Sequence, residues 1–329
     1  MALSIVSDLA WEPVAVDMAA KQNATIFIDG EAGTTGLQIR ERLAGLRGVT
    51  VKRIDAKLRK DPAARKALMR EVDLVVLCLP DDAAKEAVAL ADELGSDAPK
   101  IIDASTAHRV APGWVYGFAE LDHDQADKIR KAKRVANPGC YPTGAIALLR
   151  PLIEAGFIPK DFPITVNAVS GYSGGGKSMI ESYEVAKTAP PFELYALGLE
   201  HKHVPELMAY TGLTRRPIFL PSVGNFKQGM LVSIPLHLDT LPGKPSTSDL
   251  EDALLAHYRG SEAVRVAEVP NSATSKIEPQ ALNNTDQLDL FVFGNDTQHH
   301  AVLVARLDNL GKGAAGAAVQ NLQLMLGLG

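Results

Sequence analysis

Ala24-Thr-Ile-Phe-Ile-Asp29 runs directly into Gly30-Glu-Ala-Gly33-Thr-Thr-Gly36 near the start of this chain. The first segment is short, apolar and β-rich, which predicts a strand. Leu37, Ile39 and Leu43 then alternate with polar residues, which predicts an amphipathic helix. Strand, glycine-rich turn and helix start come in the order of a phosphate cradle, where glycines admit a pyrophosphate to the backbone and first-turn N–H groups bind it.

The glycine spacing is G-x-x-G-x-x-G rather than G-x-G-x-x-G, and a plain tight turn would also explain it. The following segments favour the cradle. Residues 50–55, 72–79 and 100–105 are strand-like, and Pro80-Asp-Asp starts an alanine-rich helix after the second of them. Strands that alternate with helices predict an α/β fold with a Rossmann-like, doubly wound parallel sheet and ligands at the carboxyl ends of its strands.

Composition limits the possible functions. The chain has 329 residues, enough for about two domains, with 46% hydrophobic and 22% charged residues. Its formal charge of 34 − 39 = −5 argues against nucleic acid as a partner. No apolar run is long enough for a membrane span, and residues 1–22 lack a signal-peptide pattern, so we expect a cytoplasmic protein with an N-terminal arm.

The residues alone do not decide whether the cofactor is NAD or NADP. Asp55 ends the second predicted strand, where an acidic side chain usually holds the 2′-hydroxyl of NAD. Lys57, Arg59 and Lys60 follow at once and would instead pair with the 2′-phosphate of NADP, unless they are solvated loop charges.

The two cysteines, too few for a disulfide framework or a cysteine-built zinc site, lie in different contexts. Cys78 falls inside an apolar predicted strand, which indicates a buried packing residue with a raised pKa. Cys140 follows Pro138-Gly139, and a helix is predicted to begin just after it. The partial positive charge of a helix N-terminus stabilises a thiolate, so Cys140 is the candidate nucleophile.

A proton shuttle for this thiol is sought among the eight histidines. His201-Lys-His203 precedes a helix predicted from Pro205, and either imidazole suits general acid–base work. No third ligand lies nearby, so we expect no metal. His299-His300 lies in a predicted hairpin and is interpreted as a turn pair. A nucleotide fold with a reactive cysteine and a histidine favours hydride transfer between a nicotinamide and a cysteine-bound acyl group.

Six blocks of sequence follow one another along the chain: Gly30-Glu-Ala-Gly-Thr-Thr-Gly36, Tyr116-Gly-Phe-Ala-Glu-Leu121, Asn137-Pro-Gly-Cys-Tyr-Pro-Thr-Gly144, Ser170-Gly-Tyr-Ser-Gly-Gly-Gly176, His201-Lys-His-Val-Pro-Glu206 and Asp308-Asn-Leu-Gly-Lys-Gly-Ala-Ala-Gly316. In these blocks the chain resembles the N-acetyl-gamma-glutamyl-phosphate reductases, relatives of the aspartate-semialdehyde dehydrogenases, and in particular their compact second subgroup. The resemblance spans residues 24–329. Residues 105–109 depart from the commoner subgroup's pattern, which leaves the details of substrate contact open.

The resemblance implies NADPH-dependent reduction of N-acetyl-glutamyl 5-phosphate to the 5-semialdehyde, with release of phosphate, in arginine biosynthesis. It implies Cys140 as the nucleophile and His201 or His203 as the acid–base. The expected cofactor residues for NADP(H) are Gly30, Gly33, Thr34, Thr35, Gly36, Ser105, Gly174 and Asn309, with Asn309 at the nicotinamide carboxamide. The expected substrate contacts are Arg109 as anion clamp, Ser173, Lys177 and Glu206.

The same resemblance implies a domain plan. An arm of residues 1–23 precedes a dinucleotide-binding domain of residues 24–138, which a C-terminal helix within 309–329 completes. Residues 139–308 form a second, α+β domain with a mixed sheet that pairs subunits into a homodimer or homotetramer. Strand-like runs at 163–170, 229–238, 264–269 and 288–306 agree with a sheet-rich second half.

Two other functions are compatible with the sequence. A pocket that differs by one methylene would make the chain a reductase of aspartyl or N-acetyl-aminoadipyl phosphate, because sequence does not resolve such a difference. A nucleotide-sensing protein that has lost catalysis would keep the fold, although Cys140 and the histidine pair argue against it.

Overall fold

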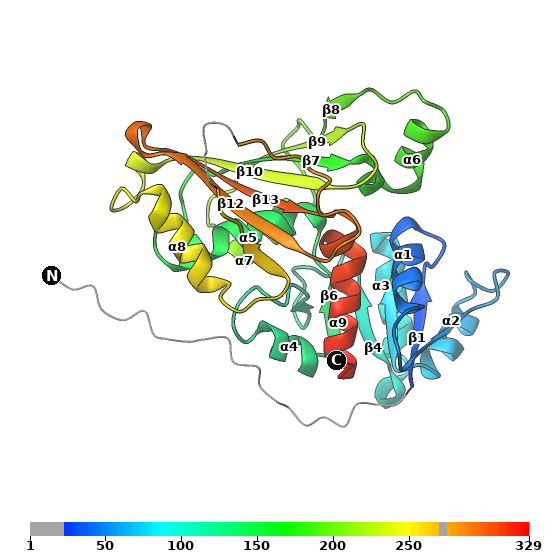
Figure 1. Cartoon of the computed structure of the whole chain (residues 1–329). Helices are drawn as coiled ribbons and strands as arrows, with labels where there is room; N and C mark the ends of the chain where they lie inside the picture. Colours follow the sequence, from blue (N-terminus) through cyan, green and yellow to red (C-terminus); the bar gives the residue numbers. More distant parts are fainter. Residues whose placement is uncertain (1–22, 270–274, 329) are drawn as a thin grey trace.

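The computed structural model describes residues 23–269 and 275–328, so the expected N-terminal arm lies almost wholly outside the described residues. Two sheets with their covering helices make up this part of the chain (Figure 1). None of its helices is long and apolar enough to cross a membrane.

The first sheet has six strands in the order β2-β1-β3-β4-β6-β5, and every neighbouring pair is parallel. Its strands are β1 (Ala24–Asp29), β2 (Val49–Lys52), β3 (Leu74–Leu77), β4 (Lys100–Asp103), β5 (Val115–Tyr116) and β6 (Arg134–Ala136). Helices on both faces of a parallel sheet are the doubly wound arrangement, so the expected fold class is confirmed.

The second sheet is mixed, with seven strands in the order β11-β12-β13-β10-β7-β9-β8. Its strands are β7 (Thr165–Gly171), β8 (Phe192–Leu194), β9 (Ile218–Gly224), β10 (Met230–His237), β11 (Val264–Val266), β12 (Leu288–Asn295) and β13 (His300–Leu307). The pairs β7–β9 and β11–β12 are parallel and the others antiparallel. A turn over residues 296–299 joins β12 to β13, so His299-His300 does lie in a hairpin.

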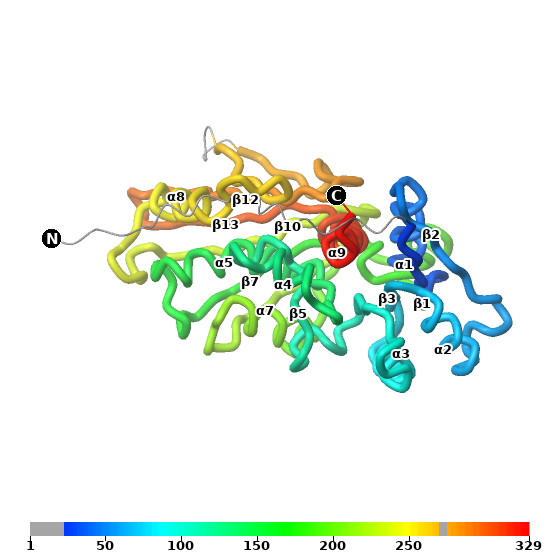
Figure 2. Tube along the Cα trace, turned by 90° about the horizontal axis from the view of Figure 1, so that it is seen from below, coloured from blue at the N-terminus to red at the C-terminus, as the bar shows by residue number. Residues whose placement is uncertain are grey.

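The helices are α1 (Thr34–Leu43), α2 (Pro62–Arg70), α3 (Asp81–Asp92), α4 (Gln125–Lys131), α5 (Cys140–Glu154), α6 (Gly176–Glu184), α7 (Val204–Thr211), α8 (Thr247–His257) and α9 (Gly316–Leu326). Buried side chains of α5, α7 and α8 share one core with the second sheet. The last helix, α9, packs its buried face into the core of the first sheet beside α1 and α4 (Figures 1 and 2).

Several predicted boundaries were wrong by a few residues, and the differences matter for the site. The second strand ends at Lys52 rather than Asp55, so Arg53 is the first residue beyond it. The third strand ends at Leu77, which puts Cys78 past its carboxyl end rather than inside it. The helix expected just after the second cysteine begins at Cys140 itself, with Gly139 as its N-cap.

Candidate active site

The glycine loop joins β1 to α1 with a backbone that admits no larger residue. Gly30 has φ +94°, and a Cβ on it would lie 2.3 Å from the carbonyl oxygen of Cys78. A Cβ on Gly36 would lie 2.6 Å from the carbonyl oxygen of Gly30. Gly33 is the N-cap of α1, and Thr34 and Thr35 are its first two residues, so their backbone N–H groups stand at the helix N-terminus.

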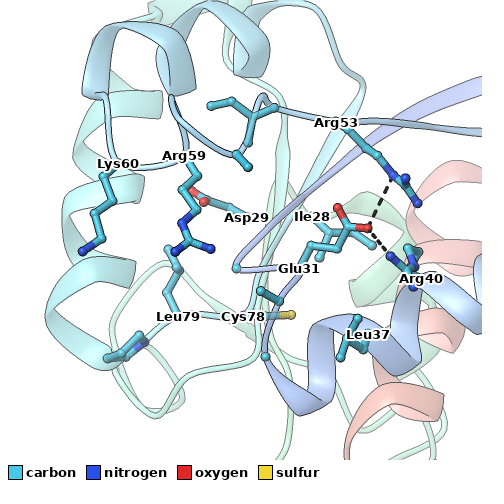
Figure 3. Close-up of a pocket in the computed structure, with 16 residues that line it drawn as sticks. Ile28, Asp29, Glu31, Leu37, Arg40, Arg53, Arg59, Lys60, Cys78 and Leu79 are labelled. Carbon is cyan, nitrogen blue, oxygen red and sulfur yellow. Dashed lines mark hydrogen bonds and ion pairs between the residues drawn. The ribbon is translucent and has the colours of Figure 1, made fainter.

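A pocket of about 620 Å³ opens beside this loop, and its lining includes Gly30, Gly33, Cys78 and four basic side chains, namely Arg40, Arg53, Arg59 and Lys60. Figure 3 shows Arg40 and Arg53 converging on Glu31, at 2.9 and 3.5 Å, while Arg59 and Lys60 extend from the segment beyond Arg53. Asp55 does not line the pocket, and its carboxylate accepts the backbone N–H of Lys57 at 2.8 Å. This side of the pocket is therefore rich in basic side chains, and Arg53 is a pocket residue that the sequence analysis missed.

The second group of candidates surrounds Cys140. Pro138-Gly139 leads from β6 to the first turn of α5, where the backbone N–H of Gly139 donates to Glu206 Oε1 at 2.7 Å. Glu206 Oε2 accepts from Arg109 at 2.9 Å, and Glu206 Oε1 also accepts from the hydroxyl of Tyr116 at 2.7 Å. Arg109 is buried and also donates to the carbonyl oxygen of Asn137 at 3.0 Å. The loop after β4, strand β5, the loop after β6 and helix α7 thus meet at a buried ion pair next to the cysteine.

The two candidate histidines differ in their surroundings. His203 is buried, and a Cβ on Gly139 would lie 2.8 Å from its Nε2, so this nitrogen faces the residue that precedes Cys140. Its Nδ1 has no hydrogen-bond partner among the described residues. His201 is half-buried, packs edge-on against Tyr141 and Phe219, and its Nδ1 accepts the backbone N–H of His203 at 3.2 Å. His203 is therefore the histidine that faces the turn before Cys140, and His201 contacts the backbone of His203 from the other side of Lys202.

In the free protein, burial favours the neutral forms of the Cys140 thiol and of both histidines. Burial raises the pKa of the Cys140 thiol to about 11, although the Arg109 charge and the backbone N–H of Tyr141 lower it. Burial and then the Arg109 charge hold the pKa of His203 well below its usual value, and burial lowers that of His201 to about 4. In the free protein, desolvation of the sulfur therefore outweighs the stabilisation of a thiolate by the helix N-terminus.

The remaining candidates fall into three places. Asn309 Nδ2 donates to Ser173 Oγ at 3.0 Å and its Oδ1 accepts from Gly229 N at 2.8 Å, so Asn309 ties the second glycine loop, with Gly174, to a neighbouring turn. Ser105 binds the carboxylate of Asp103 and, with Arg109, lines a separate pocket of about 420 Å³. The side chain of Lys177 is 81% exposed and lies 3.9 Å from Glu181, so it is not part of either group.

Sequence reasoning missed further members of the site. Tyr116 lies in one of the quoted sequence blocks, but nothing in that block shows that its hydroxyl reaches Glu206. Lys202, between the two histidines, lines the pocket with Arg109 and Ser105. Gly313 abuts Cys140, since a Cβ on it would lie 2.8 Å from the Cβ of the cysteine. No group of metal-ligating side chains is found among the residues that the structure describes.

Comparison with known proteins identifies the class to which this fold belongs. Residues 30–129 match the family model of the semialdehyde dehydrogenase NAD-binding domain, and residues 140–309 match that of the semialdehyde dehydrogenase dimerisation domain. Two solved structures share the fold at low identity: aspartate semialdehyde dehydrogenase II from Vibrio cholerae complexed with ASA (TM-score 0.66, 16% identity, 93% of this chain and 98% of that one) and the enzyme with NADP from Candida albicans (TM-score 0.61, 14%, 92% and 98%). The two family models together place the chain among the semialdehyde dehydrogenases.

Curated relatives narrow the class. N-acetyl-gamma-glutamyl-phosphate reductase from Chelativorans sp. is 53% identical over 92% of this chain and 98% of its own length. N-acetyl-gamma-glutamyl-phosphate reductase 2 from Nostoc sp. is 52% identical over 92% and 97%. The chain belongs to the N-acetyl-gamma-glutamyl-phosphate reductase family, an oxidoreductase family with a nicotinamide-binding domain.

The raised pKa values of the two thiols permit a pH prediction. Burial raises the pKa of Cys78 to about 12 and that of Cys140 to about 11, so iodoacetamide should alkylate both slowly at neutral pH in the free protein. The thiolate fraction, and hence the rate, should rise about tenfold per pH unit up to these values, with Cys140 about tenfold faster than Cys78. Peptide mass spectrometry after timed alkylation at several pH values measures both rates. A Cys140 rate that levels off near pH 7 would contradict the raised pKa.

Proposed function

We propose that this protein reduces N-acetyl-L-glutamyl 5-phosphate to N-acetyl-L-glutamate 5-semialdehyde with NADPH, releasing phosphate, in the arginine biosynthesis of the cytoplasm. One observation carries the proposal: Cys140 begins α5 beside the cluster of Arg109, Glu206 and His203. Membership of the reductase family supports the acyl phosphate as substrate class.

The residues around the glycine loop fit a dinucleotide. Gly30 and Gly36 let the loop backbone pack closely against Cys78 and against itself, which keeps the loop at the N-terminus of α1. Gly33, Thr34 and Thr35 would hold the pyrophosphate there. The basic pocket lining would hold a 2′-phosphate. When bound, NADPH supplies the hydride that reduces the acyl carbon.

The protein's own residues then perform an acyl transfer. The Cys140 sulfur bonds to the acyl carbon of the substrate, the bond from that carbon to the phosphate oxygen breaks, and phosphate leaves. His203 receives the thiol proton at Nε2 and returns it to the sulfur when the carbon–sulfur bond breaks after reduction. Arg109 pairs with the phosphate through its guanidinium, and Glu206 holds Arg109 and the Gly139 N–H in place.

The raised pKa of Cys140 fits this order of events. In the free protein, proton transfer from the thiol to His203 is uphill, which keeps the sulfur protected from oxidation and adventitious alkylation. The positive charge of Arg109 contributes to the low pKa of His203. A bound acyl phosphate brings negative charge that offsets Arg109, so it raises the basicity of His203 at the moment when the base is needed.

The assay that tests the proposal runs the reaction backwards. Phosphate-dependent reduction of NADP⁺ is measured with N-acetyl-glutamate, N-acetyl-aminoadipate and aspartate semialdehydes. The N-acetyl-glutamate compound should give the highest kcat/KM, and mass spectrometry should find its acyl adduct on Cys140 and not on Cys78. Better turnover of another semialdehyde would reassign the substrate, and cofactor binding without turnover would indicate a sensing protein.

NADP preference gives a separate prediction. Replacing Arg59 with alanine should raise KM for NADPH by about tenfold and leave KM for NADH unchanged, because only NADPH offers a 2′-phosphate to the guanidinium. Lys57→Ala is the matched control, since Lys57 is exposed and does not line the pocket. Steady-state kinetics with both cofactors give the ratio. An equal change with NADPH and NADH would show that Arg59 does not read the 2′ position.

We also propose that the second sheet pairs subunits into a homodimer or homotetramer. The region that matches the dimerisation-domain family contains this sheet, and its β13 carries Val302, an apolar side chain that is 37% exposed. Sedimentation velocity tests the assembly, and a monomer at micromolar concentration would refute it.

A further inference from the structure

Lys312 is a buried cation that the mechanism above does not use. Its side chain is 1% exposed, and its ammonium donates to Glu120 Oε2 at 2.7 Å and to Gln320 Oε1 at 2.8 Å. Gln320 Nε2 in turn donates to Glu120 Oε1 at 2.7 Å, so the three side chains close a ring. Glu120 lies in the loop after β5 and Gln320 in α9. A buried charge is tolerated when it is paired and hydrogen-bonded in this way.

Lys312 is also part of an unusual turn. Residues Gly311–Ala315 form a π-helix, in which the N–H of Gly313 donates to Asp308 O and that of Ala315 to Leu310 O, both at 2.9 Å. Such five-residue spacing is rare and appears mostly as single turns at functional sites. Asn137 Nδ2 donates to the carbonyl oxygen of Ala314 at 3.0 Å, so the turn is tied to the loop that precedes Cys140.

The π-helix touches the cysteine itself. A Cβ on Gly313 would lie 2.8 Å from Cys140 Cβ and 3.3 Å from Cys140 Cα, so the turn's backbone lies directly against the first residue of α5. Relaxation of the turn to ordinary α-helical spacing would rotate Gly313 relative to Lys312. It would therefore change what covers the thiol.

We infer that Lys312 is a positioning residue for Cys140: its ring with Glu120 and Gln320 holds the π-helix in the form that presses Gly313 against the cysteine. The inference rests on the proposed role of Cys140 as the nucleophile. Lys312 acts through the turn and contacts neither the sulfur nor a substrate. The ring thus couples the loop after β5, the last helix and the reactive residue.

The test uses Lys312→Met in the full-length protein. The methionine keeps most of the side-chain volume and removes the ammonium. Glu120 and Gln320 both line a pocket of about 550 Å³, so water can reach the carboxylate that loses its partner. Lys100→Met is the matched control, because Lys100 donates to the carbonyl oxygen of Met325 near the other end of α9 and has no part in the ring.

Two measurements should move in opposite directions in Lys312→Met. Turnover, as kcat, should fall at least about tenfold with both KM values within about threefold, because the sulfur is misplaced rather than the binding sites. Alkylation of Cys140 at a given pH should become faster, because a relaxed turn admits water and lowers the pKa of the thiol. Alkylation of Cys78 should stay unchanged, which separates local loosening from general unfolding, and Lys100→Met should leave all three values unchanged.

Wild-type kcat together with a wild-type pH profile for Cys140 in Lys312→Met would overturn the inference. If that variant does not fold, Glu120→Gln/Lys312→Met removes both charges and carries the same test. In this double variant, recovery of thermal stability with slow turnover and a shifted Cys140 profile supports positioning. Recovery of thermal stability, turnover and the Cys140 profile together would show that the ring only stabilises the fold. The alkylation profile needs no turnover. A failure of the proposed function, seen as retained turnover in the Cys140→Ala variant, is therefore distinguishable from a failure of this inference.

Discussion

Cys140→Ala should lower kcat for the reductase reaction by about four orders of magnitude or more, the largest effect expected of any single substitution in this protein. No other described group can form the thioester, because Cys78 lies past the end of β3 among the residues that line the glycine-loop pocket. Stopped-flow measurement of NADPH oxidation with the acyl phosphate gives the rate. Retention of more than about a tenth of the activity would contradict the covalent mechanism.

The control for this variant is cofactor binding. Cys140 does not line the pocket beside the glycine loop, so the Kd for NADPH, from quenching of intrinsic fluorescence, should stay within about twofold of that of the wild type. Cys78→Ala is the matched cysteine variant. It should keep turnover, with the small loss of stability that follows removal of a sulfur from a packed site.

Much of the nucleotide-binding half could be predicted because its signals are local. A buried strand, three glycines and an amphipathic helix are contiguous at residues 24–43, and the observed strand and helix follow them closely. The ribose end was harder. The second strand ends at Lys52, three residues before its predicted end at Asp55, and no sequence pattern sets a strand end that finely.

The sequence could name a candidate nucleophile, but it could not describe that residue's environment. Proline, glycine and a following helix pointed to Cys140 as the candidate from local sequence alone. The contacts that set its chemistry join residues far apart along the chain: Tyr116 to Glu206, Arg109 to Glu206, and Gly313 to Cys140. These contacts bury the sulfur, and this burial raises the thiol pKa even though the helix N-terminus lowers it. The sequence of one segment does not show how deeply the rest of the fold buries that segment.

Gly139→Ala should be the second most damaging substitution, although it adds only a methyl group. That Cβ would lie 2.5 Å from an Arg109 terminal nitrogen, 2.8 Å from His203 Nε2 and 3.0 Å from Glu206 Oε2. All three side chains are buried, so none can swing into solvent to make room. Overpacking at such a site costs about 1–3 kcal/mol of folding free energy.

The loss of activity should exceed the loss of stability. The methyl group would push the anion clamp, its carboxylate and the proposed base apart, and a displacement of about 1 Å at reacting groups costs on the order of a hundredfold in rate. We therefore expect kcat/KM to fall at least about a hundredfold while thermal unfolding stays cooperative. Gly45→Ala is the control, because the nearest atom to a Cβ there is 3.8 Å away and its φ is not positive. Near-normal turnover in Gly139→Ala would mean that the close approach of Arg109, Glu206 and His203 to the cysteine turn is not what makes this site reactive.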